Sequence, residues 1–273
     1  MSIWYDIERV IEIKSICTAF KTKYPENYYY EGEAHMAWEL VCVLDGRACI
    51  TAGSEIFYLK KGQAILHTPM EFHRITTENN NPEIAIIVFD APIMPEIKSR
   101  IYSINPENML LICGICDDVM KAFDYSSIEG SVRTLPGEEL RANMVLLKTE
   151  LLLLSVFQNF KVTKTETIES QVALNYMKIA KILEENVDKN LTIDDIAKLC
   201  NMSGSNVKKC FSKYSGSGVI SYFNTLKIKK AMKLLGQGVS IEETAYNLGF
   251  SDRNYFSTVF KRISGYPPTH YKK

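Results

Sequence analysis

Hydrophobic residues follow two different periods along this chain, and the change of period divides it into segments. From about Tyr28 to Phe89, apolar and β-branched residues are dense, and turn residues recur at short intervals. Many short strands with such spacing predict an all-β sandwich or barrel. After Pro106 the apolar spacing becomes helical, which predicts helices over 109–123 and 138–160.

The second of these predicted helices carries a long apolar stripe at three- and four-residue spacing. Its members are Leu140, Met144, Leu147, Leu151, Leu154 and Phe157. A helix so apolar must bury this stripe, either against its own barrel or against the same helix of a second subunit. We favour the second arrangement and expect a homodimer that forms through the N-terminal domain.

The remaining pattern predicts an α+β protein with two domains. Residues 1–160 form the first domain, a β-barrel with trailing helices, and the polar stretch 161–171 reads as a linker. Residues 172–273 are helical in pattern throughout. A chain of 273 residues can bury a separate core in each domain.

Charge is distributed unevenly between the two halves, although the net charge is zero. Residues 171–273 contain 16 Lys and Arg against 8 Asp and Glu, whereas residues 1–170 contain 16 against 24. Such an asymmetry is typical of a chain in which one half binds a polyanion. Charge alone indicates the type of partner and says nothing of the fold.

Composition limits the cellular context. No apolar run reaches the ~18 residues of a membrane span, and the first residues lack a basic region followed by a long apolar stretch. The seven cysteines are odd in number and most lie in apolar segments, so a disulfide framework is not expected. We therefore expect a soluble cytoplasmic protein without a membrane partner.

One pattern occurs twice in the basic half, over 191–211 and again over 239–260. Each copy opens with a capping box, in which a hydroxyl and a carboxylate three residues later can satisfy free amides at a helix start. The residues of these boxes are Thr192 with Asp195, and Ser240 with Glu243. A small residue follows where two helices must touch, Ala197 in the first copy and Ala245 in the second.

The chain then turns four residues after each alanine, at Asn201 and at Gly249, residue types that tolerate a left-handed backbone. Ser203 and Ser251 are expected to cap the next helix. A core-facing residue is expected ten residues after each alanine, and these positions hold Val207 and Tyr255. A small residue, a turn and an apolar residue at these offsets predict a helix-turn-helix unit, whose second helix enters the major groove of DNA.

Residues from about Val172 to Tyr271 resemble the DNA-binding domain of the AraC/XylS family of bacterial transcription regulators. The resemblance runs through LTIDDIAKLCNMS, KIKKAMKLL and IEETAYNLGFSDRNYFSTVFKRISGYPPTHY. The resemblance implies that the chain binds double-stranded DNA through two groove helices about one DNA turn apart. It also allows a contact with RNA polymerase. Lys227 and Lys230 stand where family members often carry Arg, and Lys keeps the charge but loses the bidentate fork.

The resemblance also implies which side chains meet DNA. Groove-facing positions fall on Ser205, Lys208, Lys209, Arg253, Asn254, Ser257 and Thr258. Arg and Lys can read guanine, Asn can pair with adenine, and hydroxyls reach bases or phosphates. For Lys209 and Thr258 a phosphate contact is an equal alternative. Contacts to the DNA backbone, or plain solvated charge, are expected at Lys213, Lys227, Lys229, Lys230, Lys261 and Arg262.

The β-rich segment resembles the cupin-like domain of many such regulators, on the stretches HMAWE, VLDG, LKKG and PMEFH. Strand alternation places His35, Glu39, Val41 and Val43 on one face, and His73 arrives from a later strand. In this resemblance the face lines the pocket of a small organic effector, a sugar or a small acid. We therefore assign effector binding to His35, Glu39 and His73, with no cofactor and no metal.

Two alternatives to the effector pocket stay open on the same residues. In metal-binding cupins such positions hold a divalent ion, but the motif there has a second His two residues before His35, where this chain has Glu33. Two His and one carboxylate could still bind a metal or only hydrogen-bond to one another. An incomplete ligand set argues against a metalloenzyme fused to a DNA-binding module, so we expect a protein that is not an enzyme.

Other conspicuous residues receive structural interpretations. Trp38 falls on the opposite strand face and should pack, His67 has no partner that the sequence identifies, and the Tyr28–Tyr30 run is expected to pack on the sheet. Cys113 and Cys116 could form a redox pair or half a zinc site. At helical spacing both fall on one apolar face, so we favour packing and keep a redox or metal sensor as the alternative.

Overall fold

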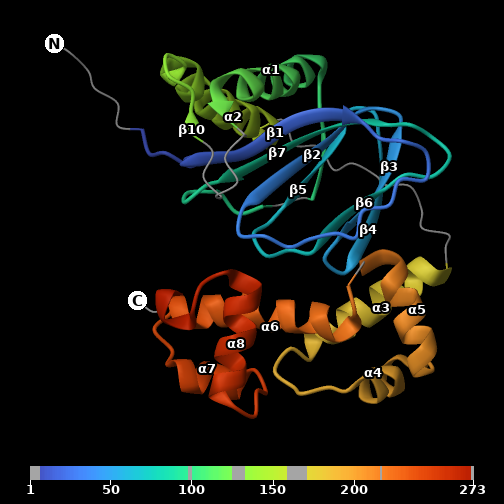
Figure 1. Cartoon of the computed structure of the whole chain (residues 1–273). Coiled ribbons are helices and arrows are strands. Elements are labelled where there is room, and N and C mark those ends of the chain that lie inside the picture. The colour runs from blue at the N-terminus through green and yellow to red at the C-terminus, as the bar shows by residue number, and fades with distance from the viewer. Residues whose placement is uncertain (1–6, 98–99, 125–132, 159–170, 216, 272–273) are drawn as a thin grey trace.

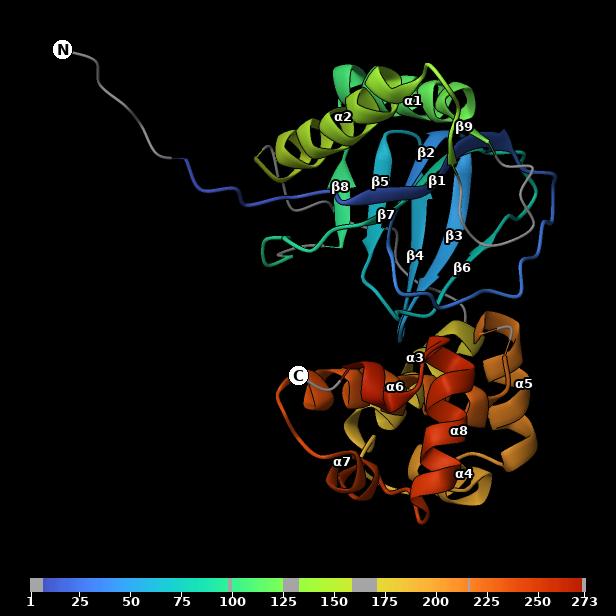
Figure 2. The same ribbon diagram turned by 60° about the vertical axis from the view of Figure 1, so that its left-hand side comes forward.

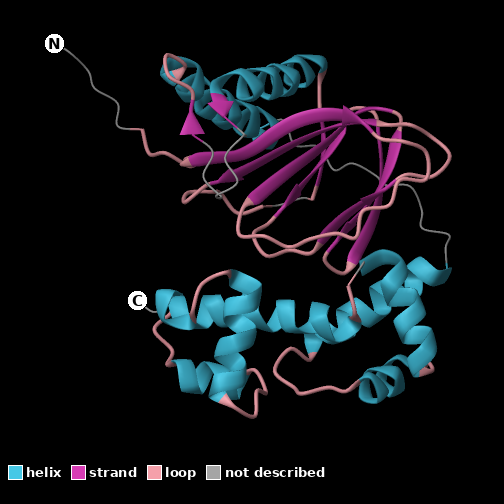
Figure 3. Cartoon of the chain, viewed as in Figure 1, coloured by secondary structure: helices cyan, strands magenta, loops and turns pink. Residues whose placement is uncertain are grey.

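The computed structural model describes residues 7–97, 100–124, 133–158, 171–215 and 217–271. Its N-terminal part is built of strands followed by two helices, and its C-terminal part is entirely helical (Figure 1, Figure 3). The predicted α+β class with two domains is confirmed. Residues 161–170 of the predicted linker lie outside the described residues, and Gln171 already belongs to the first helix of the C-terminal domain.

The described residues of the N-terminal domain form ten strands, of which two are very short, and two helices. In chain order they are β1 (Ser15–Lys23), β2 (Trp38–Asp45), β3 (Arg47–Ala52), β4 (Glu55–Lys60), β5 (Gln63–His67), β6 (His73–Thr76), β7 (Glu83–Asp90), β8 (Ile101–Ser103), α1 (Pro106–Ala122) and α2 (Glu139–Gln158), with the short pair β9 (Phe123–Asp124) and β10 (Arg133–Thr134) between the helices. The helices lie within a few residues of the ranges that apolar spacing predicts.

Strands β1 to β8 form two antiparallel sheets that face each other, and, among the described residues, β9 pairs only with β10. The larger has the order β1-β7-β2-β5-β8 and the smaller the order β4-β3-β6. Strand β1 pairs with β7 from Ser15 opposite Asp90 to Lys23 opposite Glu83, so residues before Tyr28 belong to the sheet. Our expected start of the β segment was therefore too late, because β1 alternates polar and apolar residues at an edge and lacks a continuous apolar run.

Alternation along the strands produces two separate cores in this domain. Val41, Val43 and Ile65 point between the sheets and meet Ile50 of the smaller sheet. The opposite face of the larger sheet, which carries Leu40 and neighbouring apolar residues, packs against α1 and α2. The domain is thus layered as helices, larger sheet and smaller sheet (Figure 2).

Helix α2 exposes the stripe that its sequence marks as apolar. Leu140, Leu147 and Leu151 are 84%, 56% and 58% exposed, and Met144 and Leu154 are exposed as well. The helix packs on α1 and the sheet through a different face, which includes Val145 and Leu152. Phe157, the last member of the predicted stripe, packs against the core of its own domain beside Tyr102. The other five members are left uncovered by the barrel of the same chain.

Over residues 171–215 and 217–271, the C-terminal domain has six helices and a short 3-10 turn. They are α3 (Gln171–Glu185), α4 (Ile193–Cys200), α5 (Gly204–Ser215), α6 (Val219–Gly236), α7 (Ile241–Asn247), α8 (Arg253–Ser264) and η1 (Pro268–Tyr271). Helix α6 runs between two bundles (Figure 1). One bundle packs α3, α4 and α5 around Val207 and Phe211, and the other packs α7 and α8 around Phe256 and Phe260.

The first bundle also packs against the smaller sheet. Phe72, which follows β5, joins its core and meets Tyr222 of α6 edge-on at 5.8 Å between ring centroids. The hydroxyl of Tyr176 in α3 donates to the carbonyl of Gly53 at 2.6 Å. The C-terminal domain therefore lies on the far side of the sandwich from α1 and α2 (Figure 2). Among the described helices, none combines the length and apolar character needed to cross a bilayer.

Candidate functional site

The first helix-turn-helix unit consists of α4 and α5. Thr192 and Asp195 form the predicted capping box, with both reciprocal hydrogen bonds present. Helix α4 ends at Asn201, whose φ of 52° is left-handed, as its residue type predicts. The hydroxyl of Ser203 then accepts from the backbone N–H of Asn206 at 3.2 Å and caps α5.

The second unit consists of α7 and α8. Ser240 caps α7 by accepting from the N–H of Glu243 at 3.1 Å. Gly249 has a φ of +68°, and a Cβ there would lie 2.8 Å from the carbonyl oxygen of Asp188, so only glycine fits. Our predicted cap for α8, Ser251, is wrong: Asp252 accepts from the N–H groups of the first helical turn.

A second prediction for this unit is also wrong, and both errors have the same cause. Tyr255 was expected in the core, but it is 54% exposed, and Phe256 is fully buried in its place. Helix α5 begins seven residues after Ala197, whereas α8 begins eight residues after Ala245. The second turn is one residue longer, so the core position moves by one residue.

The predicted groove-facing side chains lie on the outer faces of α5 and α8. Ser205, Lys208 and Lys209 are exposed on α5, and Arg253 and Asn254 are exposed at the start of α8. All of them stay accessible while the C-terminal domain packs against the smaller sheet.

Further along α8 the two predicted hydroxyls differ in accessibility. Ser257 is half-buried, and the exposed Thr258 donates its hydroxyl to the carbonyl of Asn254 at 3.0 Å. The accessible side chains of both helices match the donors and acceptors that major-groove recognition uses.

Lys227 is not a DNA contact, which corrects our prediction. It is 4% exposed, and its Nζ donates to the carbonyl of Lys189 at 2.6 Å and to that of Leu248. Its ammonium also lies 4.7 Å from the ring centroid of Phe223. Burial lowers the pKa of Lys227 to about 8. This lysine joins the two helix-turn-helix units from inside.

Lys229 also serves the interior of the protein. Its Nζ donates to the hydroxyl of Thr68 in the N-terminal domain at 3.1 Å, and burial lowers its pKa to about 8. The other four predicted backbone contacts are exposed cations: Lys213, Lys230, Lys261 and Arg262. They remain candidates for phosphate contacts.

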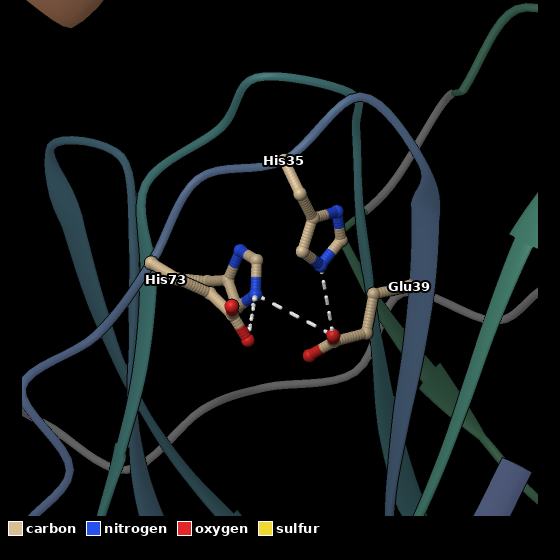
Figure 4. A group of neighbouring side chains, drawn as sticks. His35, Glu39 and His73 are labelled. Carbon is tan, nitrogen blue, oxygen red and sulfur yellow. Dashed lines mark hydrogen bonds and ion pairs between the residues drawn. The ribbon is translucent and has the colours of Figure 1, made fainter. Parts of the chain in front are cut away.

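The three residues assigned to the effector lie close together (Figure 4). Glu39 and His73 line a cavity between the sheets, whereas His35 contacts Glu39 but does not line the cavity. His35 Nε2 lies 3.2 Å from Glu39 Oε2, and His73 Nε2 lies 3.4 Å from the same oxygen. Glu39 belongs to β2 and His73 to β6, whereas His35 precedes β2, so strand alternation does not place it. The cavity has a volume of about 220 Å³.

Glu33 completes this cluster, and its role was missed because the sequence pattern favours histidine there. Single ligand atoms of Glu33, His35, Glu39 and His73 lie within 4.8 Å of one another. His73 Nδ1 lies 2.9 Å from the carbonyl oxygen of Glu71, which can only accept, so Nδ1 carries the hydrogen. Its Nε2 faces the carboxylates of Glu33 and Glu39: a protonated ring donates to them, whereas a bound divalent cation would take the Nε2 lone pair instead.

His67 has a partner that the sequence did not identify. It is 1% exposed, stacks on His73 at 4.7 Å between ring centroids, and places Nδ1 3.2 Å from Glu71 Oε2. Arg100 donates to the other oxygen of the same carboxylate. Burial, reinforced by the charge of His73, holds the pKa of His67 well below its usual value.

The tyrosines before β2 also differ from the prediction. Tyr28 and Tyr30 line the cavity together with Tyr24, and only Tyr29 between them points elsewhere. Their spacing of two residues was the available signal for a shared face.

The carboxyl group of Glu39 is ionised by its neighbours. Burial alone would raise the pKa of Glu39, but hydrogen bonds from His35 and His73 outweigh it and hold that pKa well below the usual range.

Cys113 and Cys116 lie in α1, and both are free thiols. Burial raises the pKa of Cys116 to about 12, with a further contribution from Cys113. A thiol with a raised pKa is a poor nucleophile and metal ligand. This geometry favours the packing role over the redox sensor.

Comparison with known proteins identifies the helical domain. Residues 196–273 match the family model of a helix-turn-helix domain. The Msm operon regulatory protein of Streptococcus mutans is 30% identical over 134 residues, which is 48% of either chain. The raffinose operon transcriptional regulatory protein RafR of Pediococcus pentosaceus is 29% identical over 116 residues, 42% of this chain and 39% of that protein. The chain therefore spans about half the length of these curated relatives.

Among solved structures, ToxT from Vibrio cholerae O395 is similar with 14% identity and a TM-score of 0.38, over 93% of this chain and 95% of that one. The C-terminal domain of AraT from Geobacillus stearothermophilus has 24% identity and a TM-score of 0.36, over 38% of this chain and 87% of that one. The matched family model and the two units built of α4–α5 and α7–α8 agree, and they show that residues 196–273 of this chain form a helix-turn-helix domain.

Proposed function

We propose that this chain is a sequence-specific transcription regulator whose DNA binding responds to a small molecule held in the N-terminal domain. One observation carries the proposal: two helix-turn-helix units, joined through Lys227, present exposed Lys, Arg, Asn and Ser side chains on α5 and α8. The segment around them has twice as many cations as carboxylates. Two such helices on one chain fit successive major grooves, about 20 base pairs per subunit.

Binding to DNA is tested on the full chain with duplexes selected from a random pool. Lys208→Ala and Arg253→Ala should each weaken binding to the selected duplex more than tenfold, and each bidentate contact to a base contributes about 1–3 kcal/mol of discrimination. Lys181→Ala is the matched control, because it removes the same charge from an exposed position on α3. Equal binding of the chain to every duplex would contradict the proposal.

The effector site is the cavity between the sheets. Its wall combines aromatic rings with carboxylates and His73, which suits a small polar molecule such as a sugar. A volume of about 220 Å³ is below the ~300–1,000 Å³ of pockets for drug-sized ligands, so the effector is small. Isothermal titration with monosaccharides tests this, and Tyr28→Ala should abolish any binding that the unchanged chain shows.

A homodimer is the arrangement that best explains α2. Leu140, Met144, Leu147, Leu151 and Leu154 alternate steps of four and three residues, which is the seam of a helix pair. The stripe is exposed on the single chain, and a two-fold interface would cover it with its own copy. Leu147→Glu should yield monomers in sedimentation velocity, and Lys181→Glu, which adds negative charge at an exposed position on α3, should not.

A divalent cation is a second candidate for the pocket. Glu33, His35, Glu39 and His73 would hold it through two nitrogens and two oxygens, a donor set that suits zinc or a neighbouring transition metal. Such an ion would supply positive charge between the carboxylates. Titration with Zn²⁺ should then give one site per chain, and His73→Gln should remove it, whereas a heat signal unchanged by His73→Gln would contradict this candidate.

A further inference from the structure

Arg74 reaches out of the N-terminal domain to the C-terminal end of helix α5. It lies in β6 directly after His73, is only 1% exposed, and lines the effector cavity. Its Nη1 donates to the carbonyl oxygen of Lys213 in α5 at 2.5 Å. Its guanidinium lies 3.8 Å from the ring centroid of Tyr29, whose hydroxyl donates to the carbonyl of Ser212 at 3.4 Å.

These contacts fall where a helix needs them. Helix α5 ends at Ser215, so the carbonyls of Ser212 and Lys213 belong to the last four, which have no partner within the helix. The C-terminal end of a helix carries partial negative charge, which favours a cation placed against it. Arg74 and Tyr29 thus supply the donors that this end lacks, from the other domain.

Arg74 also has no stronger partner available. No carboxylate among the described residues forms an ion pair with it, and burial lowers its pKa. Removing a charged group from water is costly unless it is paired. The end of α5 and the Tyr29 ring are therefore the groups that compensate the burial of Arg74. Separation of the domains would remove the contact with α5 and leave only the contact with Tyr29.

We propose that Arg74 is a positioning residue for DNA recognition: it fixes the C-terminal end of α5, and through β6 it connects that end to the effector cavity. The proposal rests on the proposed regulatory function. Lys208 and Lys209 lie one turn before Ser212 and Lys213. Contacts that fix the last turn of α5 therefore also fix the direction in which Lys208 and Lys209 point. His73, one residue before Arg74, contacts Glu39 in the cavity, so the same strand meets both sites.

The test uses hydrogen–deuterium exchange of the full chain without DNA, followed by DNA binding. Arg74→Met keeps an unbranched side chain of similar length in the buried space but has no donor. The amides of the last turn of α5 should exchange about tenfold faster, as expected when a bond from a charged donor is lost. Arg74→Lys retains one cationic donor and should restore most of the protection.

Ser54→Ala is the matched control. It removes another bond between the domains, from the Ser54 hydroxyl to Glu184 of α3 at 3.0 Å, and does not touch α5. It should leave exchange at the end of α5 unchanged. On selected DNA, Arg74→Met should weaken binding about tenfold and Arg74→Lys much less.

Several results would overturn the proposal. Faster exchange spread over the β strands, with α5 unchanged, would make Arg74 a packing residue only. Faster exchange at α5 without a loss of DNA affinity would show that the contacts of Arg74 with α5 do not contribute to DNA recognition. If the unchanged chain does not select DNA, the proposed function fails, while the exchange data still decide whether Arg74 holds α5.

Discussion

Lys227 and Lys230 lie one helical turn apart on α6. Substituting Lys227 should lower the stability of the protein, whereas substituting Lys230 should change its affinity for DNA. Lys227 is buried and donates to two carbonyls, whereas Lys230 is exposed. In Lys227→Met the side chain keeps its length and loses its charge. The buried carbonyl of Leu248 then lacks a partner, while that of the exposed Lys189 can turn to water.

The magnitude follows from these two bonds. An unsatisfied buried carbonyl costs about 1–3 kcal/mol, and a bond from a charged donor contributes about 1.5–3 kcal/mol. We expect Lys227→Met to lower the free energy of unfolding of the C-terminal domain by about 2–3 kcal/mol. Lys230→Ala, at an exposed position, should stay within about 0.5 kcal/mol of the unchanged chain.

Two assays separate the roles. Urea unfolding followed by circular dichroism measures stability, and DNA affinity at several salt concentrations counts phosphate contacts. Each lost contact lowers the slope of log K against log salt by about 0.9. Lys230→Ala should change the slope by about that amount and Lys227→Met should not. A stable Lys227→Met chain with a reduced slope would refute the reasoning.

Three further predictions follow from other parts of the chain. Arg253→Ala should relax base preference at one position by about 1–3 kcal/mol in a selection experiment, whereas Arg262→Ala should weaken binding evenly across sequences. Gly249→Ala should lower the thermal midpoint by several degrees, because its φ is left-handed and Asp188 blocks a Cβ; an unchanged midpoint would refute this. His67 stays neutral when folded but is protonated when unfolded below about pH 6.5, so stability should fall by up to about 1.4 kcal/mol per pH unit below that pH, and less in His67→Gln.

The helix-turn-helix units were predictable because their signals are local. Capping hydroxyls, a left-handed Asn201 and the glycine at 249 act within a few residues, and the structure shows them where the sequence places them. Tyr255 and Ser251 were misassigned because the second turn has one more residue than the first. The small residue and the turn residue do not determine how many residues precede the next helix.

Roles that depend on packing could not be predicted in the same way. Lys227 has the residue type of a surface cation, and only the meeting of two bundles around α6 buries it. His67 packs on His73, and Glu33 joins the pocket, through pairings between segments distant in sequence, Glu39 opposite His67 and Glu33 opposite His73. Arg74 contacts α5 because the C-terminal domain packs against β6, a meeting that no local sequence signal predicts.

Footprinting of the full chain on a selected duplex tests the central claim most directly. The account predicts protection of two major grooves on one face of the DNA, about 10 base pairs apart, with one of them lost in Lys208→Ala and the other in Arg253→Ala. Protection of a single groove, or protection that does not depend on sequence, would contradict the claim that both helix-turn-helix units read DNA.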